Sequence, residues 1–249
     1  MTKKGKTSAP KPGKNRGRVT VTPDGPYLVT GGLPLGKEII AVNREGIPVK
    51  WDKGKRFPDR EKYALCRCGK SDKMPYCDGT HDEVGFDGTE TAGNEAYLNQ
   101  ADTLTGPDLV LTDAEAFCAI ARFCDRSGGV WNLTDNSDDP ESKKTAIQEA
   151  CDCPAGRLVA WDKTTEKPIE PGFEPSISLI EDPDQNVSGP IWVKGGVPIV
   201  SSDGTEYEIR NRVTLCRCGE SENKPFCDGS HISIGFTAEK RQLIRKPGI

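Results

Sequence analysis

The sequence predicts an α+β fold in which two copies of a small, mostly β unit flank a different α+β segment. Three observations predict it: an internal repeat, short β-branched and aromatic runs bounded by Gly and Pro in both copies, and helix signals that fall between the copies. The 249 residues are enough for two or three small domains. Only 34 % of them are hydrophobic and 6 % aromatic. Each unit is therefore expected to have a small hydrophobic core and to need a stabilising cross-link such as a disulfide or a bound metal.

The repeat defines the two copies. Residues 25–35 match residues 189–199, and residues 65–86 match residues 215–236. The matched blocks are further apart in the first copy, which indicates an insertion from roughly Gly36 to Lys55. Each copy is expected to contain a strand ending at a Gly-Gly pair, a second extended segment and a cysteine-rich loop. The second extended segments cover residues 63–65 and 207–215.

The segment between the copies, residues 107–183, has the pattern of a small α+β domain. Thr112 and Glu115 form a capping box that predicts the start of a helix, and Pro140 suits the first turn of another. In chain order we expect a strand at 109–111, a helix at 112–124, a strand at 130–133, a helix at 140–150 and a strand at 157–161. The Gly/Thr/Asn- or Pro-rich residues 87–106 and 163–176 are expected to be linkers.

Charge is unevenly placed along the chain. Residues 1–18 hold seven basic side chains and no acidic one, whereas the whole chain has a net charge of −4. The acidic body argues against a nucleic-acid partner. For residues 1–22 we expect a basic, disordered tail. The alternatives are a tether to an acidic partner or a targeting sequence, although the tail lacks the apolar face of an amphipathic transit peptide.

Residues 1–26 contain no continuous apolar stretch like that of a secretory signal. No run approaches the roughly 18 apolar residues of a membrane span. We therefore expect a soluble cytoplasmic protein without a membrane span. In such a reducing compartment, cysteines bind metal more readily than they form disulfides.

Six of the ten cysteines and both histidines form two Cys-x-Cys-x8-Cys-x3-His patterns. The candidate metal ligands are Cys66, Cys68, Cys77 and His81 in the first copy, and Cys216, Cys218, Cys227 and His231 in the second. Because both histidines of the chain fall at this one position, we expect both to be ligands. Such a set suits either tetrahedral zinc or a two-iron cluster.

The spacing indicates how the four ligands of a set would be shared between the two irons of a cluster. Two thiolates one residue apart most easily bind one iron, and Cys77 and His81 can bind the second. Pro75 shapes the turn between the pairs, Asp78 can cap the short helix that follows, and Gly79 allows the backbone to approach a sulfur. Backbone N–H groups at this helix start would point at the cluster. Spacing alone leaves a structural zinc-binding interaction module as the alternative.

Residues 66–81 and 216–231 resemble the signature of the CDGSH iron–sulfur (NEET) family. Residues 227–231 read Cys-Asp-Gly-Ser-His, and the first copy differs only in Thr80. The resemblance implies one [2Fe-2S] cluster per copy, held by three cysteines and one histidine, with the histidine-bound iron near solvent and labile to acid. Family members pair two units under a β-cap, so it also implies a monomeric, intramolecular pseudo-dimer. The two units would cover residues 23–88 and 187–245.

The other four cysteines lie in the middle segment as Cys118-x5-Cys124 and Cys151-x-Cys153-Pro-x-Gly. This pattern resembles the divergent 4Fe-4S mono-cluster ferredoxin domain. It implies a ferredoxin-like domain at residues 107–183 and a possible third iron–sulfur cluster. Residues 119–123 differ from the family because they read partly as a buried helix face. The alternative is therefore that these are reduced core cysteines.

The combined prediction is an iron–sulfur protein that carries one electron, or stores and transfers clusters in response to redox state or pH. A histidine ligand should raise the reduction potential, and its protonation should weaken the bond to iron. The partner would be an unknown redox protein or apo-protein. An enzyme is not expected and no catalytic residue is assigned, because both histidines serve as ligands and no phosphate-binding glycine loop is present.

Overall fold

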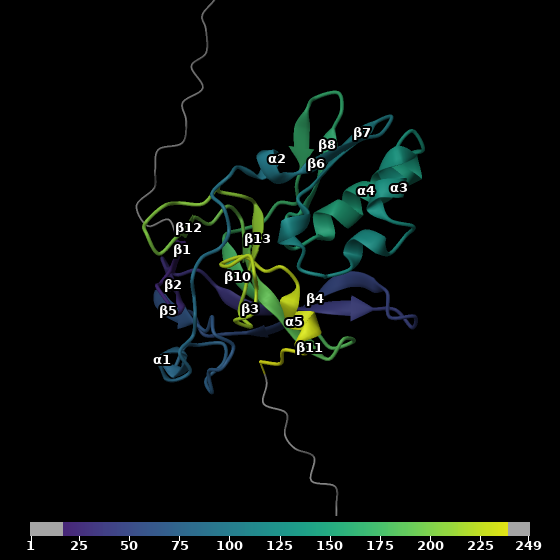
Figure 1. Ribbon diagram of the computed structural model, residues 1–249. Helices are drawn as coiled ribbons and strands as arrows, with labels where there is room; N and C mark the ends of the chain where they lie inside the picture. Colours follow the sequence, from purple (N-terminus) through teal and green to yellow (C-terminus); the bar gives the residue numbers. More distant parts are fainter. Residues whose placement is uncertain (1–16, 239–249) are drawn as a thin grey trace, which may run out of the picture.

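The computed structural model describes residues 17–238 of the chain (Figure 1). In these residues three sheets carry most of the regular structure. The middle segment, with helices α3 (Val130–Asp135) and α4 (Pro140–Asp152), lies at one end of the molecule (Figure 1). It contacts the first copy through Trp51, whose ring packs against Phe123. None of the helices in this range could span a bilayer, since the longest, α4, has 13 residues.

The first sheet has the strand order β12–β1–β2–β5. Its strands are β1 (Arg18–Val21), β2 (Tyr27–Thr30) and β5 (Lys62–Leu65) from the first copy, and β12 (Ile199–Val200) from the second. Strand β2 pairs antiparallel with β1 and β5, whereas β12 pairs parallel with β1. Tyr27 and Val29 are buried while Leu28 is exposed, which is the alternation of a sheet with one face on the core.

The second sheet has the order β13–β11–β10–β3–β4. Its strands are β10 (Ser176–Asp182), β11 (Val187–Lys194) and β13 (Arg212–Leu215) from the second copy, and β3 (Leu35–Val42) and β4 (Pro48–Arg56) from the first. Strand β3 pairs parallel with β10, and the other pairs are antiparallel. Every residue of β11 is buried, as in a strand covered on both faces.

The two copies exchange a strand. In each copy the strand after the Gly-Gly pair leaves its own sheet and pairs parallel with the first strand of the other copy, β3 with β10 and β12 with β1. Gly31 and Gly195 turn the chain with positive φ angles of 80° and 78°, which glycine adopts without strain. The predicted insertion lengthens β3 and adds β4. One core cluster contains residues of both copies, such as Leu65 and Leu215.

The third sheet belongs to the middle segment and has the order β6–β7–β8–β9, with all pairs antiparallel. Its strands are β6 (Asp102–Thr105), β7 (Leu109–Asp113), β8 (Leu158–Asp162) and β9 (Lys167–Ile169). Leu111 and Leu158 pack with Ala146 and Ala150 of α4. The Asp139 carboxylate accepts the Ser142 N–H at 2.8 Å and so caps α4. The predicted mixed fold, mostly sheet with a separate segment between two copies, is confirmed.

The predicted helix at 112–124 is wrong. Residues up to Asp113 belong to β7, and only two short 3-10 turns follow, η1 (Glu115–Phe117) and η2 (Phe123–Asp125). Between them Ile120 and Arg122 have positive φ angles of 49° and 63°. Packing of this loop against the second copy therefore overrides the local capping signal.

The predicted strand at 130–133 is also wrong, because these residues begin α3. Val130, Leu133 and Thr134 are its buried residues, and their spacing is that of a helix face. The expected linkers are partly ordered elements. Residues 87–106 contain α2 (Tyr97–Gln100) and β6, and residues 163–176 contain β9.

Several expected boundaries also change. The tail predicted at 1–22 ends earlier, because β1 begins at Arg18 with Val19 and Val21 buried; residues 1–16 lie outside the described residues. The middle segment predicted at 107–183 begins earlier, since β6 joins its sheet, and β10 pairs with β11 and β3 instead. Residues 239–245 of the predicted second unit lie outside the described residues.

Candidate iron–sulfur sites

The first predicted ligand set lies together in two pairs. Cys66 and Cys68 follow β5, and their sulfurs are 3.7 Å apart. The Cys77 sulfur lies 3.3 Å from Nδ1 of His81, which belongs to the short helix α1 (Thr80–Glu83). A tetrahedral metal with bonds of about 2.3 Å to sulfur holds two thiolates about 3.7 Å apart. Each pair therefore has the separation of two ligands on one metal ion.

The second predicted set has the same arrangement. The sulfurs of Cys216 and Cys218 are 3.6 Å apart, and the Cys227 sulfur lies 3.5 Å from Nδ1 of His231. His231 belongs to α5 (Ser230–Ser233). The structure thus brings the eight predicted residues together as four close pairs, two in each copy.

In each copy, backbone hydrogen bonds bring the end of the cysteine loop back beside its first cysteine. Cys66 N–H donates to the Pro75 carbonyl at 2.8 Å, and Cys77 N–H donates to the Ala64 carbonyl at 3.0 Å. The second copy repeats both bonds with Cys216 to Pro225 and Cys227 to Thr214, each at 2.9 Å. These bonds extend β5 and β13 into the loops, which is why the distant third cysteine lies beside the first.

Asp78 stabilises the turn between Cys77 and His81, although the N-cap residue of α1 is Gly79 and not Asp78 as predicted. Oδ1 of Asp78 accepts hydrogen bonds from the Thr80 hydroxyl at 2.7 Å and the Thr80 N–H at 3.1 Å. The bond from the Thr80 hydroxyl lowers the pKa of Asp78 well below its usual range. Gly79 has φ 96°, a left-handed conformation that favours glycine. In the second copy the Gly229 N–H donates to the Cys227 sulfur at 3.5 Å.

Burial favours the protonated, neutral form of several of these thiols. It raises the pKa of Cys66 to about 11 and the pKa of Cys227 well above its usual value. In the second copy the hydrogen bond between Cys216 and Cys218 lowers the pKa of Cys216 to about 6 and raises that of Cys218. Binding of a metal by these groups as thiolates would therefore release protons.

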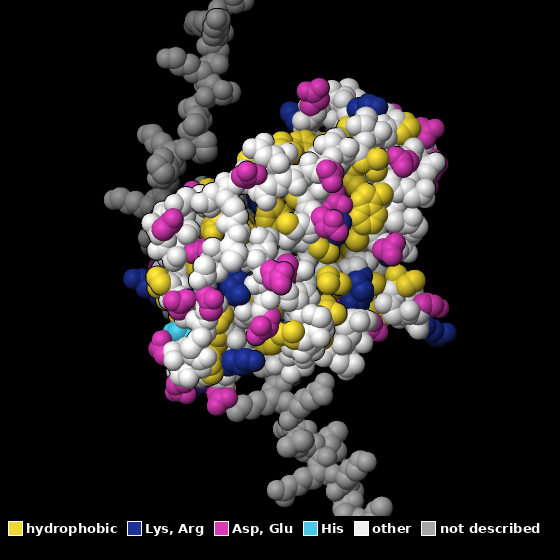
Figure 2. All heavy atoms as spheres, viewed as in Figure 1, with side chains coloured by type: hydrophobic (Ala, Val, Ile, Leu, Met, Phe, Trp, Pro, Cys, Tyr) yellow, Lys and Arg dark blue, Asp and Glu magenta, His cyan; other side chains and the backbone are white. Residues whose placement is uncertain are grey.

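The two sites differ in exposure. Tyr76, Cys77 and His81 are half-buried, and a histidine is visible at the surface over α1 (Figure 2). His231 is 4 % exposed, and burial, with the charge of Arg217, lowers its pKa to about 4. The expectation that the histidine lies near solvent is therefore wrong at the second site.

The two cysteine loops touch each other. A Cβ atom added to Gly69 would lie 2.4 Å from the carbonyl oxygen of Cys218, and one added to Gly219 would lie 2.7 Å from that of Cys68. Both glycines have positive φ angles, 73° and 91°. The loops meet backbone to backbone at equivalent positions, so the two sites are neighbours.

The arginine between the first two cysteines was missed as a structural residue. Arg67 and Arg217 are both 2 % exposed. Arg67 donates to the carbonyls of Thr22 and Gly88, and Arg217 donates to those of Gly189 and Ile180. Its presence as Cys-Arg-Cys in both copies was the signal that could have identified it.

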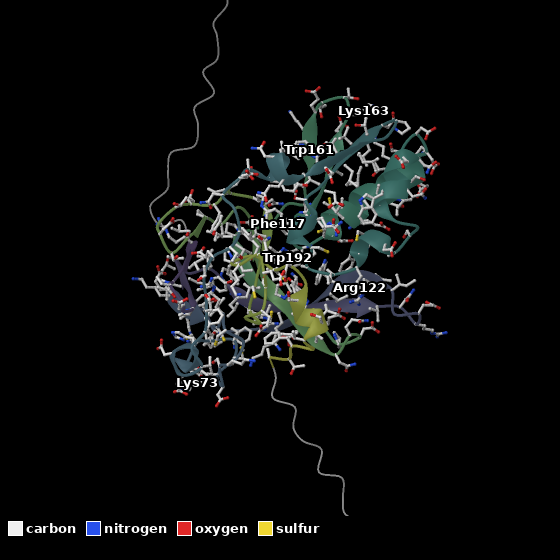
Figure 3. The ribbon with its side chains drawn as sticks, in the orientation of Figure 1. Lys73, Phe117, Arg122, Trp161, Lys163 and Trp192 are labelled. Atoms are coloured by element: carbon white, nitrogen blue, oxygen red, sulfur yellow. The ribbon has the colours of Figure 1, made fainter. Side chains whose placement is uncertain are left out.

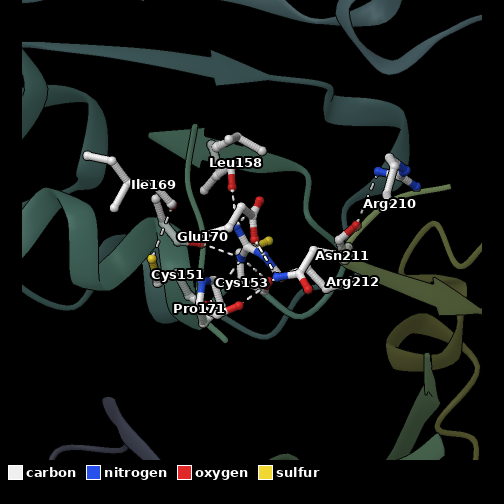
Figure 4. Close-up of polar contacts among 12 residues, drawn as sticks. Cys151, Cys153, Leu158, Ile169, Glu170, Pro171, Arg210, Asn211 and Arg212 are labelled. Atoms are coloured by element: carbon white, nitrogen blue, oxygen red, sulfur yellow. Dashed lines mark hydrogen bonds and ion pairs between the residues drawn. The ribbon is translucent and has the colours of Figure 1, made fainter. Parts of the chain in front are cut away.

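The four middle cysteines are all half-buried. Burial, with a smaller contribution from the charge of Cys153, raises the pKa of Cys124 to about 12. The Cys151 sulfur lies 3.5 Å from the Ile169 carbonyl (Figure 4). Cys151 therefore has a backbone carbonyl as a polar neighbour.

Arg212 fixes the turn that carries Cys153, a role that no sequence motif indicates. Its guanidinium donates to the carbonyls of Ala150, Cys153 and Leu158 at 2.6, 2.5 and 3.0 Å (Figure 4). It also pairs with Glu170 at 2.8 Å. Since Arg212 begins β13, it connects the middle cysteines to the strand that leads to Cys216.

Comparison with known families agrees with this geometry. The model of the iron-binding zinc finger CDGSH type matches residues 24–82 and 188–232. The model of the divergent 4Fe-4S mono-cluster matches residues 104–163. Searches of curated proteins and of solved structures each found no match. The chain therefore carries two CDGSH-type segments in tandem, with a segment of divergent 4Fe-4S type between them, and these matches support iron–sulfur binding.

Proposed function

We propose that the chain binds two [2Fe-2S] clusters and uses them for one-electron transfer or for storing and delivering clusters. The observation that carries this proposal is the division of each ligand set into two close pairs. In a two-iron cluster each iron takes two protein ligands and shares the bridging sulfides. Cys66 and Cys68 would hold one iron of the first cluster, and Cys77 and His81 the other.

The chain's own residues would tune these clusters. The histidine is a neutral ligand in place of a thiolate, which raises the reduction potential. The Gly229 N–H directed at the Cys227 sulfur stabilises negative charge there. Arg67 and Arg217 hold the loops to neighbouring carbonyls and keep each ligand set in place. When bound, each cluster accepts and releases a single electron.

The two units, residues 23–88 and 187–245 with β10 added to the second, are proposed to form an intramolecular pseudo-dimer with the exchanged strands as its β-cap. The parallel pairs β1–β12 and β3–β10 support this arrangement. The reciprocal contacts of Gly69 and Gly219 support it as well. A second chain is then not needed to complete either site.

For the middle segment we propose a third iron–sulfur group on Cys118, Cys124 and Cys153. The match of residues 104–163 to the divergent 4Fe-4S mono-cluster type supports it. Three thiolates and one further ligand suit an iron–sulfur cluster. Cys151 is left out of this set because its sulfur is directed to Ile169.

Reversible one-electron reduction tests the proposed function. Protein isolated without oxygen should be coloured, and dithionite should produce a paramagnetic [2Fe-2S] signal that disappears on reoxidation. Cys77→Ala and Cys227→Ala should each remove about half of the signal attributable to CDGSH clusters. A colourless protein with zinc at both sites would contradict the proposal and favour the structural zinc module, since zinc has no redox chemistry.

A further inference from the structure

The two turns that carry the predicted histidine ligands have different surroundings. Gly79 and Gly229 occupy equivalent places in these turns, with φ angles of 96° and 92°. A Cβ atom added to Gly79 would meet none of the described residues within 4 Å, whereas one added to Gly229 would lie 2.4 Å from Cδ1 of Ile120. Ile120 belongs to the middle segment, between η1 and η2. The middle segment therefore packs directly on the second turn, at a place that is open in the first.

The contact is made by residues 116–122, which we call the cover loop. The ring of Phe117 packs edge-on against that of Phe226, with centroids 5.2 Å apart, and Phe117 lies at this junction in Figure 3. The Asn223 side-chain amide donates a hydrogen bond to the Ala116 carbonyl at 2.9 Å. These contacts lie just before the third predicted cysteine ligand of the second set, and the contact of the isoleucine lies just after it. The cover loop thus contacts the chain on both sides of this ligand.

The fold holds the cover loop in place. Arg122 forms an ion pair with Asp182 at the end of β10, and its Nη2 lies 3.6 Å from Oδ2 of Asp184. Ile120 and Arg122 have positive φ angles of 49° and 63°. This conformation is costly for residues other than glycine, above all for a β-branched one, and persists only where the surroundings enforce it. The loop is therefore fixed against the second turn.

A second segment from outside the second copy also contacts this cysteine loop. The N–H groups of Thr91 and Ala92 donate to the Lys224 carbonyl at 2.8 and 2.9 Å, and the Thr91 hydroxyl donates to the Glu222 carbonyl at 2.5 Å. Both carbonyls lie between the second and third predicted cysteine ligands of the set. Two segments therefore restrain the loop that carries these ligands.

The predicted ligands differ in exposure between the two sites. Cys77 and His81 are half-buried, and a histidine is visible at the surface over α1 (Figure 2). Cys227 and His231 are 3 % and 4 % exposed. An external molecule therefore reaches the first pair directly, whereas access to the second pair requires the cover loop or residues 91–92 to move. Two nearly identical motifs thus differ in their access to a partner.

We propose that the cover loop gives the two sites different roles, in which the first CDGSH site delivers its cluster to an external apo-protein and the second retains its own. This proposal rests on the proposed function and narrows it to delivery at one site. The recipient must supply four ligands, and an apo-protein with four free cysteines has the required chemistry. Each bond from a ligand of the first set to iron is replaced by one from a recipient thiolate. The four thiol protons pass to the released ligands, and no electron is transferred.

Transfer to a plant-type apo-ferredoxin with four free cysteines tests this proposal. The cluster-loaded protein is mixed with the apo-ferredoxin, samples are alkylated with iodoacetamide at intervals, and mass spectrometry locates the alkylated cysteines of this chain. A cysteine that binds iron is protected, so alkylation reports the loss of each cluster. We expect Cys77 to become alkylated severalfold faster than Cys227.

One variant and a matched control test the role of the cover loop. Ile120→Gly removes the side chain that lies over Gly229, and glycine adopts the positive φ angle without strain. It should make the alkylation of Cys227 severalfold faster and leave that of Cys77 unchanged. Glu166 also has a positive φ angle, 55°, but is exposed in the turn between β8 and β9. Glu166→Gly should therefore change neither rate.

The possible results separate this inference from the proposed function. In protein that contains iron and sulfide, equal rates at Cys77 and Cys227, or alkylation of neither, would overturn the inference and leave the proposed function standing. An unchanged rate at Cys227 in Ile120→Gly would also overturn it. If that variant does not fold, Asn223→Ala, which removes the hydrogen bond to the cover loop, takes its place with the same expectations. Wild-type protein that contains zinc without sulfide would overturn both.

Discussion

Replacing Arg212 with alanine is expected to lower the free energy of unfolding by about 3–5 kcal/mol, the loss typical of removing one partner of a buried ion pair. The Arg212 side chain is 1 % exposed. Its removal leaves Glu170 without its cation and the carbonyls of Ala150, Cys153 and Leu158 without their donor. Arg212→Lys should also destabilise the chain, because one ammonium group cannot replace a planar fork of donors. Urea unfolding of the cluster-loaded protein measures the change.

Arg56 provides the matched control. Its side chain is 71 % exposed and pairs with Asp59 at 3.0 Å. Exposed ion pairs of this kind contribute less than about 1 kcal/mol, so Arg56→Ala should leave unfolding almost unchanged. Equal losses for Arg212→Ala and Arg56→Ala would mean that the buried guanidinium does not join the middle segment to β13.

Replacing Gly69 with alanine is expected to disrupt both CDGSH sites at once. Its φ angle of 73° strains any other residue by about 1–2 kcal/mol. The added Cβ atom would also lie 2.4 Å from the Cys218 carbonyl oxygen. Because the obstacle is backbone, no side-chain rotation relieves the overlap, which adds about 1–3 kcal/mol. The loops must separate, so both the thermal midpoint and the visible absorption of the clusters should fall.

Gly85→Ala is the control that measures the backbone strain without the steric overlap of the added Cβ atom. Gly85 has a similar φ angle of 59°, and a Cβ atom there would meet nothing within 4 Å. This variant should show only the loss due to backbone strain and should keep its clusters. If Gly69→Ala and Gly85→Ala lost the same stability and cluster content, the contact between the two loops would have no energetic role.

Local signals predicted the elements that depend on local chemistry. The Gly-Gly pairs after β2 and β11 and the Pro140 start of α4 are all where the sequence predicts them. The exchange of β3 and β12 between the copies could not be predicted, because it depends on pairing between segments that are distant in the chain. Thr112 shows how a local signal fails. It is buried in β7, where its hydroxyl lies 2.9 Å from the Tyr97 hydroxyl, instead of capping a helix.

The candidate sites likewise combine features that the local sequence predicts with features that depend on distant segments of the chain. The Cys-x-Cys and Cys-x3-His spacings predict the two ligand pairs because each pair is closed by its own short turn. Nothing in these spacings distinguishes His81 from His231, since the two motifs are nearly identical. One difference in their surroundings is Ile120, which lies in another segment and packs on Gly229. A motif cannot show that a loop distant in the chain will cover it, because that depends on the tertiary fold.

Iron and inorganic sulfide per chain, measured on protein isolated without oxygen, test the central claim most directly. Each CDGSH site should contain two irons and two sulfides, because its ligands form two pairs on two metals. Cys77→Ala and Cys227→Ala should each lower both contents by one cluster. Zinc at one ion per site, with no sulfide released by acid, would contradict the claim that these eight residues hold two iron–sulfur clusters.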